Sequence, residues 1–212
     1  MLLKHLVLSD FRNYPNLEVY FFDGIHILHG ENGAGKTNIL EAIYYLALTK
    51  SFRTNTDKHL IFNKASMFRI QGEFELTQGR LFNSSIAYSL AGGKRLVVNS
   101  QKIAKFSDYI GEIPAVLLAP SDLQLSQGAP YLRRRFIDVL LCQSHKLYLH
   151  HLVQYNRSLR QRNQLLQAES VDEKLLESWD ENLVTNGAEI IRKRQSTVES
   201  LSGIVREYYQ SL

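Results

Sequence analysis

Cysteine and long apolar segments are scarce in this sequence. Cys142 is the only cysteine among 212 residues, which excludes an intrachain disulfide bond. No apolar run approaches the ~18 residues that a membrane-spanning helix needs. The opening segment MLLKHLVLSDF is too short and is charged too early to match a secretory signal peptide. We therefore expect a cytoplasmic protein that has no membrane partner.

A large excess of either charge is also missing. Lysine and arginine number 25 against 21 aspartates and glutamates, so the formal net charge is +4. This mild basic balance permits an anionic partner but does not require one. The content of 44% hydrophobic and 22% charged residues is typical of a globular protein and excludes a disordered one. The length fits one large domain or two small ones.

The most informative motif is a glycine-rich segment that fits the phosphate-binding pattern G-x-x-x-x-G-K-[ST]. Apolar residues at 25, 27 and 28 precede it and indicate a short buried strand. Apolar residues at 39, 40, 43 and 46 follow it at helical spacing. Strand, loop and helix in this order are the context that the motif requires. Its residues are Gly30, Glu31, Asn32, Gly33, Ala34, Gly35, Lys36 and Thr37.

The chemistry of this segment predicts a nucleotide site. Glycines allow the backbone to wrap closely around a phosphate, and the N–H groups at the start of the next helix attract an anion. Lys36 would reach the β- and γ-phosphates, and the Thr37 hydroxyl would hold Mg²⁺. The alternative is a glycine turn with a chance lysine, which the surrounding strand and helix disfavour.

Short strands dominate the first 130 residues. Two of them form a hairpin ahead of the phosphate loop, separated by a polar turn over residues 9–16. The later ones form an antiparallel meander, and a buried strand over 113–118 returns to the core. The predicted strands before that last one cover residues 2–8, 17–22, 25–28, 68–76, 81–90 and 95–99, and a helix covers 37–48.

Helical periodicity replaces the strand signals after Pro130. Amphipathic helices are predicted over 131–142, 145–167 and 171–212, and the short link Ala168-Glu169-Ser170 makes the last two an antiparallel pair. The predicted fold class is therefore α/β: a head with a mixed sheet over residues 1–130, followed by an α-helical arm over 131–212.

Several motifs together resemble the bacterial RecF family, in the SMC-like branch of the ABC ATPases. The resemblance runs from residue 1 to about 165. The phosphate loop and its helix, GENGAGKTNILEAIYYL, are part of it. The other motifs are Phe11-Arg12-Asn13-Tyr14, Ser51-Phe52-Arg53, Pro120-Ser121-Asp122-Leu123, Gly128-Ala129-Pro130 with Arg133-Arg134, and Phe136-Ile137-Asp138.

The resemblance implies an ATP-binding mediator of DNA repair and recombination. Its head would bind ATP with Mg²⁺, form a homodimer around the nucleotide, and bind single-stranded DNA or gapped duplex. It would support recombinase loading, replication restart and SOS induction together with partner recombination mediators. By the same resemblance, Arg12 and Asn13 would lie near the phosphates and the base, and Asn38 would touch a phosphate.

One element of the family pattern is missing from the sequence. A Walker B strand has four apolar residues followed by an acidic pair, and no segment fits: Val116-Leu117-Leu118 runs into Ala119-Pro120, and Asp180-Glu181 lies on a predicted helix. The segment 125–129 imitates a signature motif but precedes the arm. No catalytic residue is identified. We therefore expect the N-terminal part of a longer protein, which holds phosphates and hydrolyses ATP poorly or not at all.

Residues 133–167 form a basic stretch with seven cations against Asp138 alone. Such cations would bind DNA phosphates without sequence preference. The alternative is an ordinary solvated helix face. Arg133 and Arg134 have a further alternative, in which they serve the core as partners of Asp138. The candidate DNA-binding residues are Arg133, Arg135, Lys146, Arg157, Arg160 and Arg162.

The remaining candidates have structural interpretations beside functional ones. The histidines at 145, 150 and 151 fit surface positions better than a metal site. Trp179, Tyr208 and Tyr209 would stack on bases or, more simply, pack within the arm. Ser121-Asp122 is either a loop that senses Mg²⁺ and water or a strand-ending turn. Two rival functions stay open, another P-loop phosphotransferase such as a small-molecule kinase, and a passive fragment for DNA binding or interaction.

Overall fold

Two compact units divide the chain, Met1–Leu117 and Leu118–Leu212. The structure is a computed structural model, and it describes residues 1–76, 79–168, 170 and 172–211. The division between the units falls after Leu117. The domain boundary expected at residue 130 stays a prediction. Each unit is described by itself.

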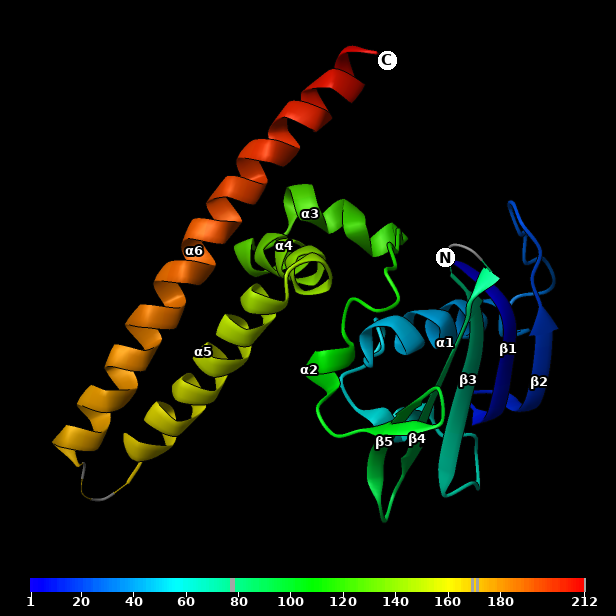
Figure 1. Ribbon diagram of the computed structural model, residues 1–212, viewed down its shortest axis with the longest axis horizontal. Coiled ribbons are helices and arrows are strands. Elements are labelled where there is room, and N and C mark those ends of the chain that lie inside the picture. Colours follow the sequence, from blue (N-terminus) through cyan, green and yellow to red (C-terminus); the bar gives the residue numbers. More distant parts are fainter. Residues whose placement is uncertain (77–78, 169, 171, 212) are drawn as a thin grey trace. The chain divides into compact units, whose positions relative to one another are not determined.

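The first unit is built on a six-stranded sheet with the order β2-β1-β3-β4-β5-β6. Every neighbouring pair in this sheet is antiparallel, so the predicted meander is confirmed (Figure 1). The strands are β1 (Leu2–Phe11), β2 (Tyr14–Tyr20), β3 (Met67–Glu75), β4 (Leu81–Ser89), β5 (Gly93–Val98) and β6 (Gln101–Ile103). Strand β6 was not predicted from the sequence.

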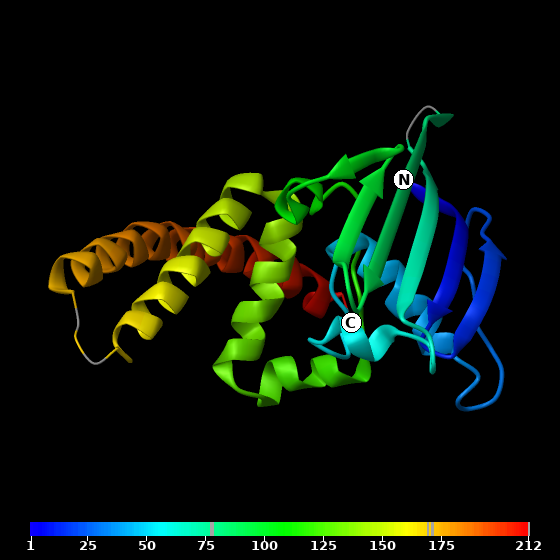
Figure 2. The same cartoon turned by 90° about the horizontal axis from the view of Figure 1, so that it is seen from below.

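Helix α1 (Lys36–Leu48) packs on one face of this sheet (Figure 2). The strands alternate, so that Leu6, Leu8, Ile70 and Ile86 point into the core and are fully buried. Gly72 on β3 allows the helix to approach, because an added Cβ would lie 2.7 Å from Cδ1 of Leu46. Two short helices complete the unit, η1 (Asp57–Leu60) and α2 (Phe106–Tyr109).

The turn between β1 and β2 is much shorter than the predicted polar turn over residues 9–16. Only Arg12 and Asn13 separate the two strands, and Arg12 has a φ of +55°. Pro15 does not break the second strand, because β2 is at the edge of the sheet, where a missing N–H costs no ladder hydrogen bond. The turn therefore brings Arg12 and Asn13 into a tight, defined position.

Two predicted strands are wrong. Residues 25–28 before the phosphate loop and residues 113–118 form no strand. Ile25 and Ile27 are 94% and 81% exposed, and Val116 and Leu118 are 96% and 89% exposed. The reason is physical: a strand needs a neighbour to complete its hydrogen bonds, and within the described ranges no strand pairs with either segment.

The second unit is helical, as predicted. It contains η3 (Pro120–Leu123), α3 (Gln124–Gln127), α4 (Pro130–Ser144), α5 (Lys146–Leu165) and α6 (Glu173–Gln210). Its core is formed by Ile137, Leu141, Tyr148 and Ile190. Helices α5 and α6 lie side by side (Figure 1). Glu169 of the predicted link, and Val171 and Leu212 at the ends of the predicted third helix, lie outside the described residues.

An ion pair joins α4 to α6 in this core. The Nε and Nη2 atoms of Arg194 donate to the two carboxylate oxygens of Asp138, each at 2.8 Å. The hydroxyl of Tyr148 donates to the same carboxylate at 2.5 Å. The predicted pairing of Asp138 with Arg133 or Arg134 is therefore wrong. Arg133 instead donates to the carbonyl oxygens of Leu125 and Gly128.

The last turns of α6 correct another expectation. Tyr208 and Tyr209 were expected to pack within the arm, but both are exposed. His151, expected at the surface, is half-buried and shares a 3.0 Å hydrogen bond with Asn186.

Among the residues that the structure describes, no three His, Cys, Asp or Glu side chains cluster at metal-binding distance. In that same part of the chain, no helix has the length and apolar character to cross a membrane.

We predict that Gly72→Ala destabilises the first unit. The added methyl group would also lie 2.8 Å from Cε2 of Phe74, a buried side chain with little room to move. Overpacking of this kind typically costs about 1–3 kcal/mol. Amide hydrogen exchange in β3 measures the loss directly. Gly203→Ala on α6 is the control, because, apart from the backbone of its own helix, no described heavy atom lies within 4 Å of its added Cβ. Unchanged protection of β3 in Gly72→Ala would contradict the prediction.

Candidate phosphate-binding site

The glycine-rich loop has the backbone that its sequence predicts. Gly30, Gly33 and Gly35 have φ values of +143°, +87° and +99°, a region that disfavours other residues. Helix α1 begins at Lys36, directly after the left-handed Gly35. The first N–H groups of a helix have no acceptor within the helix. The loop therefore directs these donors and the positive end of the helix dipole to one place.

Lys36 lies over the loop from which it starts. Its ammonium group donates to the carbonyl oxygens of Gly30 at 2.7 Å and Glu31 at 2.8 Å. Thr37, in the first turn of α1, is exposed. A Cβ added at Gly33 would meet no described atom within 4 Å. The ammonium group, the helix N-terminus and the open space fit a nucleotide phosphate, and the Thr37 hydroxyl fits one ligand position of Mg²⁺.

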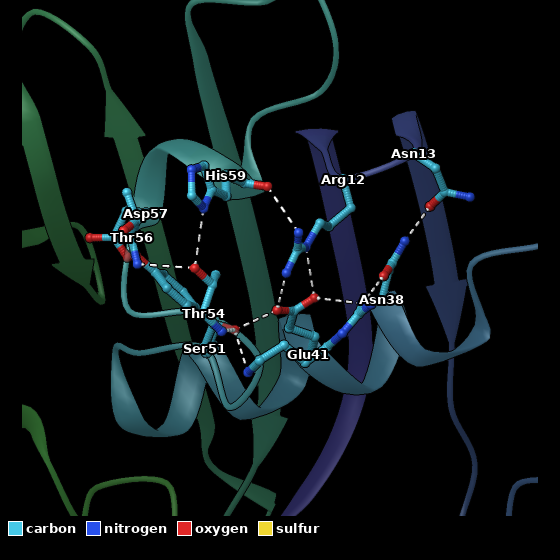
Figure 3. Close-up of polar contacts among 11 residues, drawn as sticks. Arg12, Asn13, Asn38, Glu41, Ser51, Thr54, Thr56, Asp57 and His59 are labelled. Atoms are coloured by element: carbon cyan, nitrogen blue, oxygen red, sulfur yellow. Dashed lines mark hydrogen bonds and ion pairs between the residues drawn. The ribbon is translucent and has the colours of Figure 1, made fainter. Parts of the chain in front are cut away.

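Asn13 and Tyr14 cover the other side of the loop. The Nδ2 atom of Asn13 and the hydroxyl of Tyr14 both donate to the carbonyl oxygen of Ala34, at 3.3 and 3.2 Å. A Cβ at Gly35 would lie 2.6 Å from each of these donor atoms. Asn38 donates to Asn13 at 2.7 Å (Figure 3). Asn13 and Asn38, both expected near the phosphates, are thus joined to each other and to the loop.

Arg12 is the third residue that the resemblance implies near the nucleotide, and its side chain contacts neighbouring elements of the first unit. Its Nε and Nη2 atoms donate to the carboxylate of Glu41 at 2.9 and 2.7 Å, and its Nη1 atom donates to the carbonyl oxygen of His59 at 3.0 Å. The structure therefore places the Arg12 side chain on α1 and η1. It joins the β1–β2 turn to these two elements (Figure 3).

Glu41 is the centre of this network, and sequence reasoning missed it. Its side chain is fully buried, with 0% exposure. Besides Arg12 it accepts a hydrogen bond from Ser51 at 2.5 Å and a weaker one from Arg53 at 3.4 Å. One signal was available: Glu41 is charged but lies on the same helical face as Tyr45 and Leu48. A carboxylate on a buried face requires a cationic partner.

The segment after α1 closes the network. Arg53 donates to Asn38 at 2.8 Å, so one arginine contacts both Asn38 and Glu41. Ser51 accepts hydrogen bonds from the backbone N–H groups of Arg53 and Thr54.

Farther along the chain, Lys94 forms a 2.9 Å ion pair with Asp57. Burial lowers the pKa of Lys94, and its hydrogen bond to Asp57 opposes this shift.

The predicted DNA-binding residues all lie on α4 and α5 of the second unit. Arg135, Lys146, Arg157 and Arg160 are exposed. Arg162 is half-buried and paired with Asp180 of α6, so its charge is compensated within the arm. Arg133 is exposed but donates to two backbone carbonyls.

In η3, the carboxylate of Asp122 accepts a hydrogen bond from the N–H group of Ala119 at 2.7 Å. This contact favours the interpretation of Ser121-Asp122 as a turn.

A family model described as the RecF/RecN/SMC N terminal domain matches residues 2–128. Curated relatives match over a longer range. A DNA replication and repair protein RecF from Halalkalibacterium halodurans is 39% identical over 216 residues, with 100% of this chain and 57% of the relative covered. One from Streptococcus suis is 44% identical over 202 residues, with 95% and 55% covered. The chain therefore spans a little over half the length of these relatives.

Solved structures agree with the sequence relatives. A structure of the recombination mediator protein RecF-ATP in the RecFOR pathway has a TM-score of 0.89 and 31% identity, and the match covers 94% of this chain and 54% of that one. A structure from a study of ATP-driven dimerization of SMC ATPases has a TM-score of 0.54 at 20% identity, covering 66% of this chain and 99% of that one. The second likeness concerns the fold alone.

We predict that Gly35→Ala destabilises the first unit more than Gly33→Ala does. Both substitutions carry the cost of a positive φ, but only the Cβ at residue 35 collides with Asn13 and Tyr14. The difference in the free energy of unfolding is therefore about 1–3 kcal/mol, the usual range for overpacking. Chemical denaturation of the two variants measures it. Equal destabilisation would mean that the two side chains move away freely and do not form a fixed cover.

Proposed function

The chain belongs to the RecF/RecN/SMC N-terminal domain family, and from this premise we propose that it is the ATP-binding part of a DNA replication and repair protein. The relatives that carry this description share about 40% of their residues with the chain. A structural neighbour described as RecF-ATP supports the choice of ATP. The proposal covers a cytoplasmic protein that acts on DNA with partner recombination mediators.

The observation that carries the proposal is the geometry at the start of α1. Three glycines with positive φ, a helix N-terminus and the Lys36 ammonium group converge on one open space. Anions bind at such positions because backbone N–H groups and the helix dipole act together. Lys36 would exchange its two carbonyl acceptors for phosphate oxygens, since a charged acceptor forms the stronger hydrogen bond.

The residues in and around the loop would have separate roles in nucleotide binding. Lys36 compensates the charge of the terminal phosphates, and the Thr37 hydroxyl supplies one oxygen ligand to Mg²⁺. Asn13 and Tyr14 fix the carbonyl of Ala34 and thereby the orientation of the loop. When bound, Mg-ATP supplies the charge that would draw two heads into a homodimer.

Hydrolysis is expected to be weak. Activation of water at such a site needs an acidic residue at the end of a Walker B strand, and the sequence carries no segment of that pattern. This chain would therefore bind ATP tightly enough for detection but turn it over slowly. Faster turnover would require an acidic residue that reaches the bound phosphates from another segment.

DNA binding would use the exposed cations of α4 and α5. Arg135, Lys146, Arg157 and Arg160 carry positive charge on two consecutive helices. Contacts of this kind go to phosphates, so we expect affinity for single-stranded and gapped DNA without sequence preference. Recombinase loading, replication restart and SOS induction would follow from this binding.

We predict that Lys36→Ala lowers the affinity for ATP at least about tenfold, because a charge-assisted hydrogen bond is worth ~1.5–3 kcal/mol. Anisotropy of a fluorescent ATP analogue in Mg²⁺ measures the dissociation constant. Lys102→Ala is the matched control, since it removes an exposed lysine of β6. If the chain does not bind the analogue, or if both variants bind equally well, the proposed function is wrong.

A second prediction concerns salt. Replacing Arg135, Arg157 and Arg160 together by glutamine should weaken DNA binding and flatten its dependence on salt, by a slope of ~0.9 in duplex or ~0.7 in single-stranded DNA for each phosphate that the variant no longer neutralises. Anisotropy of labelled DNA across a salt series measures both quantities. Arg192→Gln is the control, because that exposed arginine is already paired with Glu189. An unchanged slope in the triple variant would assign DNA binding to another surface.

A further inference from the structure

We propose that Glu41 is a positioning residue for nucleotide binding, which acts through Arg12 to hold the β1–β2 turn against the phosphate loop. This inference rests on the proposed binding of ATP. Glu41 has no place in the phosphate-binding pattern, which ends at Thr37. Its contacts nevertheless connect the helix after the loop to the residues that cover the loop.

The Glu41–Arg12 pair has a strong, directional geometry. Two parallel N–H···O bonds of 2.9 and 2.7 Å join the guanidinium group to the carboxylate. The carboxylate is fully buried. Removing its charge would leave Arg12 without its principal partner in a partly buried place, and such losses are strongly destabilising locally. The turn that carries Arg12 would then lose its attachment to α1.

The backbone of the turn connects Arg12 to the loop. Arg12 is followed directly by Asn13 and Tyr14, whose side chains donate to the carbonyl oxygen of Ala34. The φ of Arg12 is +55°, an uncommon value that the surroundings must enforce. Because the three residues are consecutive, fixing the Arg12 side chain also fixes the backbone from which the next two side chains project.

A second chain of contacts also leads from Glu41 to Asn13. Arg53 contacts Glu41 with one nitrogen and, with the same nitrogen, donates to Asn38. Asn38 in turn donates to Asn13. The carboxylate of Glu41 is thus joined to Asn13 by two routes, one through the backbone of the turn and one through Asn38 (Figure 3). Both routes end at the side chain that contacts Ala34 of the phosphate loop.

A general contribution to stability is the alternative to a positioning role, and the chain contains a matched control for it. Asp138 in the second unit also accepts two hydrogen bonds from one arginine, Arg194, and a 2.5 Å bond from a hydroxyl, that of Tyr148. Glu41 has a matching arginine and hydroxyl in Arg12 and Ser51, and Arg53 is a further, weaker contact at 3.4 Å. Only Glu41 is connected to the phosphate loop, so the two carboxylates separate stability from positioning.

The test compares Glu41→Gln with Asp138→Asn in the full chain. Both variants should unfold more easily. At a temperature where circular dichroism shows both to be folded, Glu41→Gln should raise the dissociation constant for the fluorescent ATP analogue about tenfold, equivalent to ~1.4 kcal/mol, while Asp138→Asn changes it less than about twofold. Equal effects of the two variants, or no effect of Glu41→Gln, would overturn the positioning role.

A double-mutant cycle provides a readout that does not depend on Glu41→Gln alone. Arg12→Lys keeps the charge but loses the two-pronged geometry, so it should also weaken ATP binding. The double variant should be little worse than either single one, because both remove the same interaction. Fully additive losses would contradict the inference. If wild-type chain binds no ATP, or Lys36→Ala binds as wild type, the proposed function fails instead, and the two failures are thereby distinguished.

Discussion

A buried negative charge on α1 is the constraint on which the arrangement around the phosphate loop depends. Glu41 lies on the face of the helix that packs against the sheet, where an unpaired carboxylate would be costly. Arg12 from the β1–β2 turn and Ser51 and Arg53 from the segment after the helix supply its partners. The β1–β2 turn must therefore meet α1 and the segment that follows it at one place.

The phosphate loop gains its fixed shape from two sources. Its glycines permit the positive φ values, and the neighbouring turn limits them from outside, because Asn13 and Tyr14 occupy the space that a side chain at residue 35 would need. The sheet contributes indirectly, since Gly72 lets α1 lie close to β3. Pre-organisation of this kind reduces the ordering cost when an anion binds.

The features that could be predicted from the sequence depend on local pattern. The phosphate loop, α1, the antiparallel meander and the helices after Pro130 all follow from spacing and turn residues over short windows. The strands predicted over 25–28 and 113–118 failed because a strand also needs a partner, and apolar periodicity does not reveal one. The partners of Asp138 and Glu41 were missed for a related reason: Arg194 and Arg12 lie 56 and 29 residues away.

Hydrogen–deuterium exchange of the chain with and without Mg-ATP tests the central claim most directly, that the phosphate loop and the β1–β2 turn bind nucleotide as one unit. The account predicts slower exchange at the backbone of residues 30–39 and, with the same dependence on ATP concentration, at residues 12–14. Protection of the loop without protection of the turn would contradict the coupling between them. No protection of the loop at saturating ATP would contradict nucleotide binding itself.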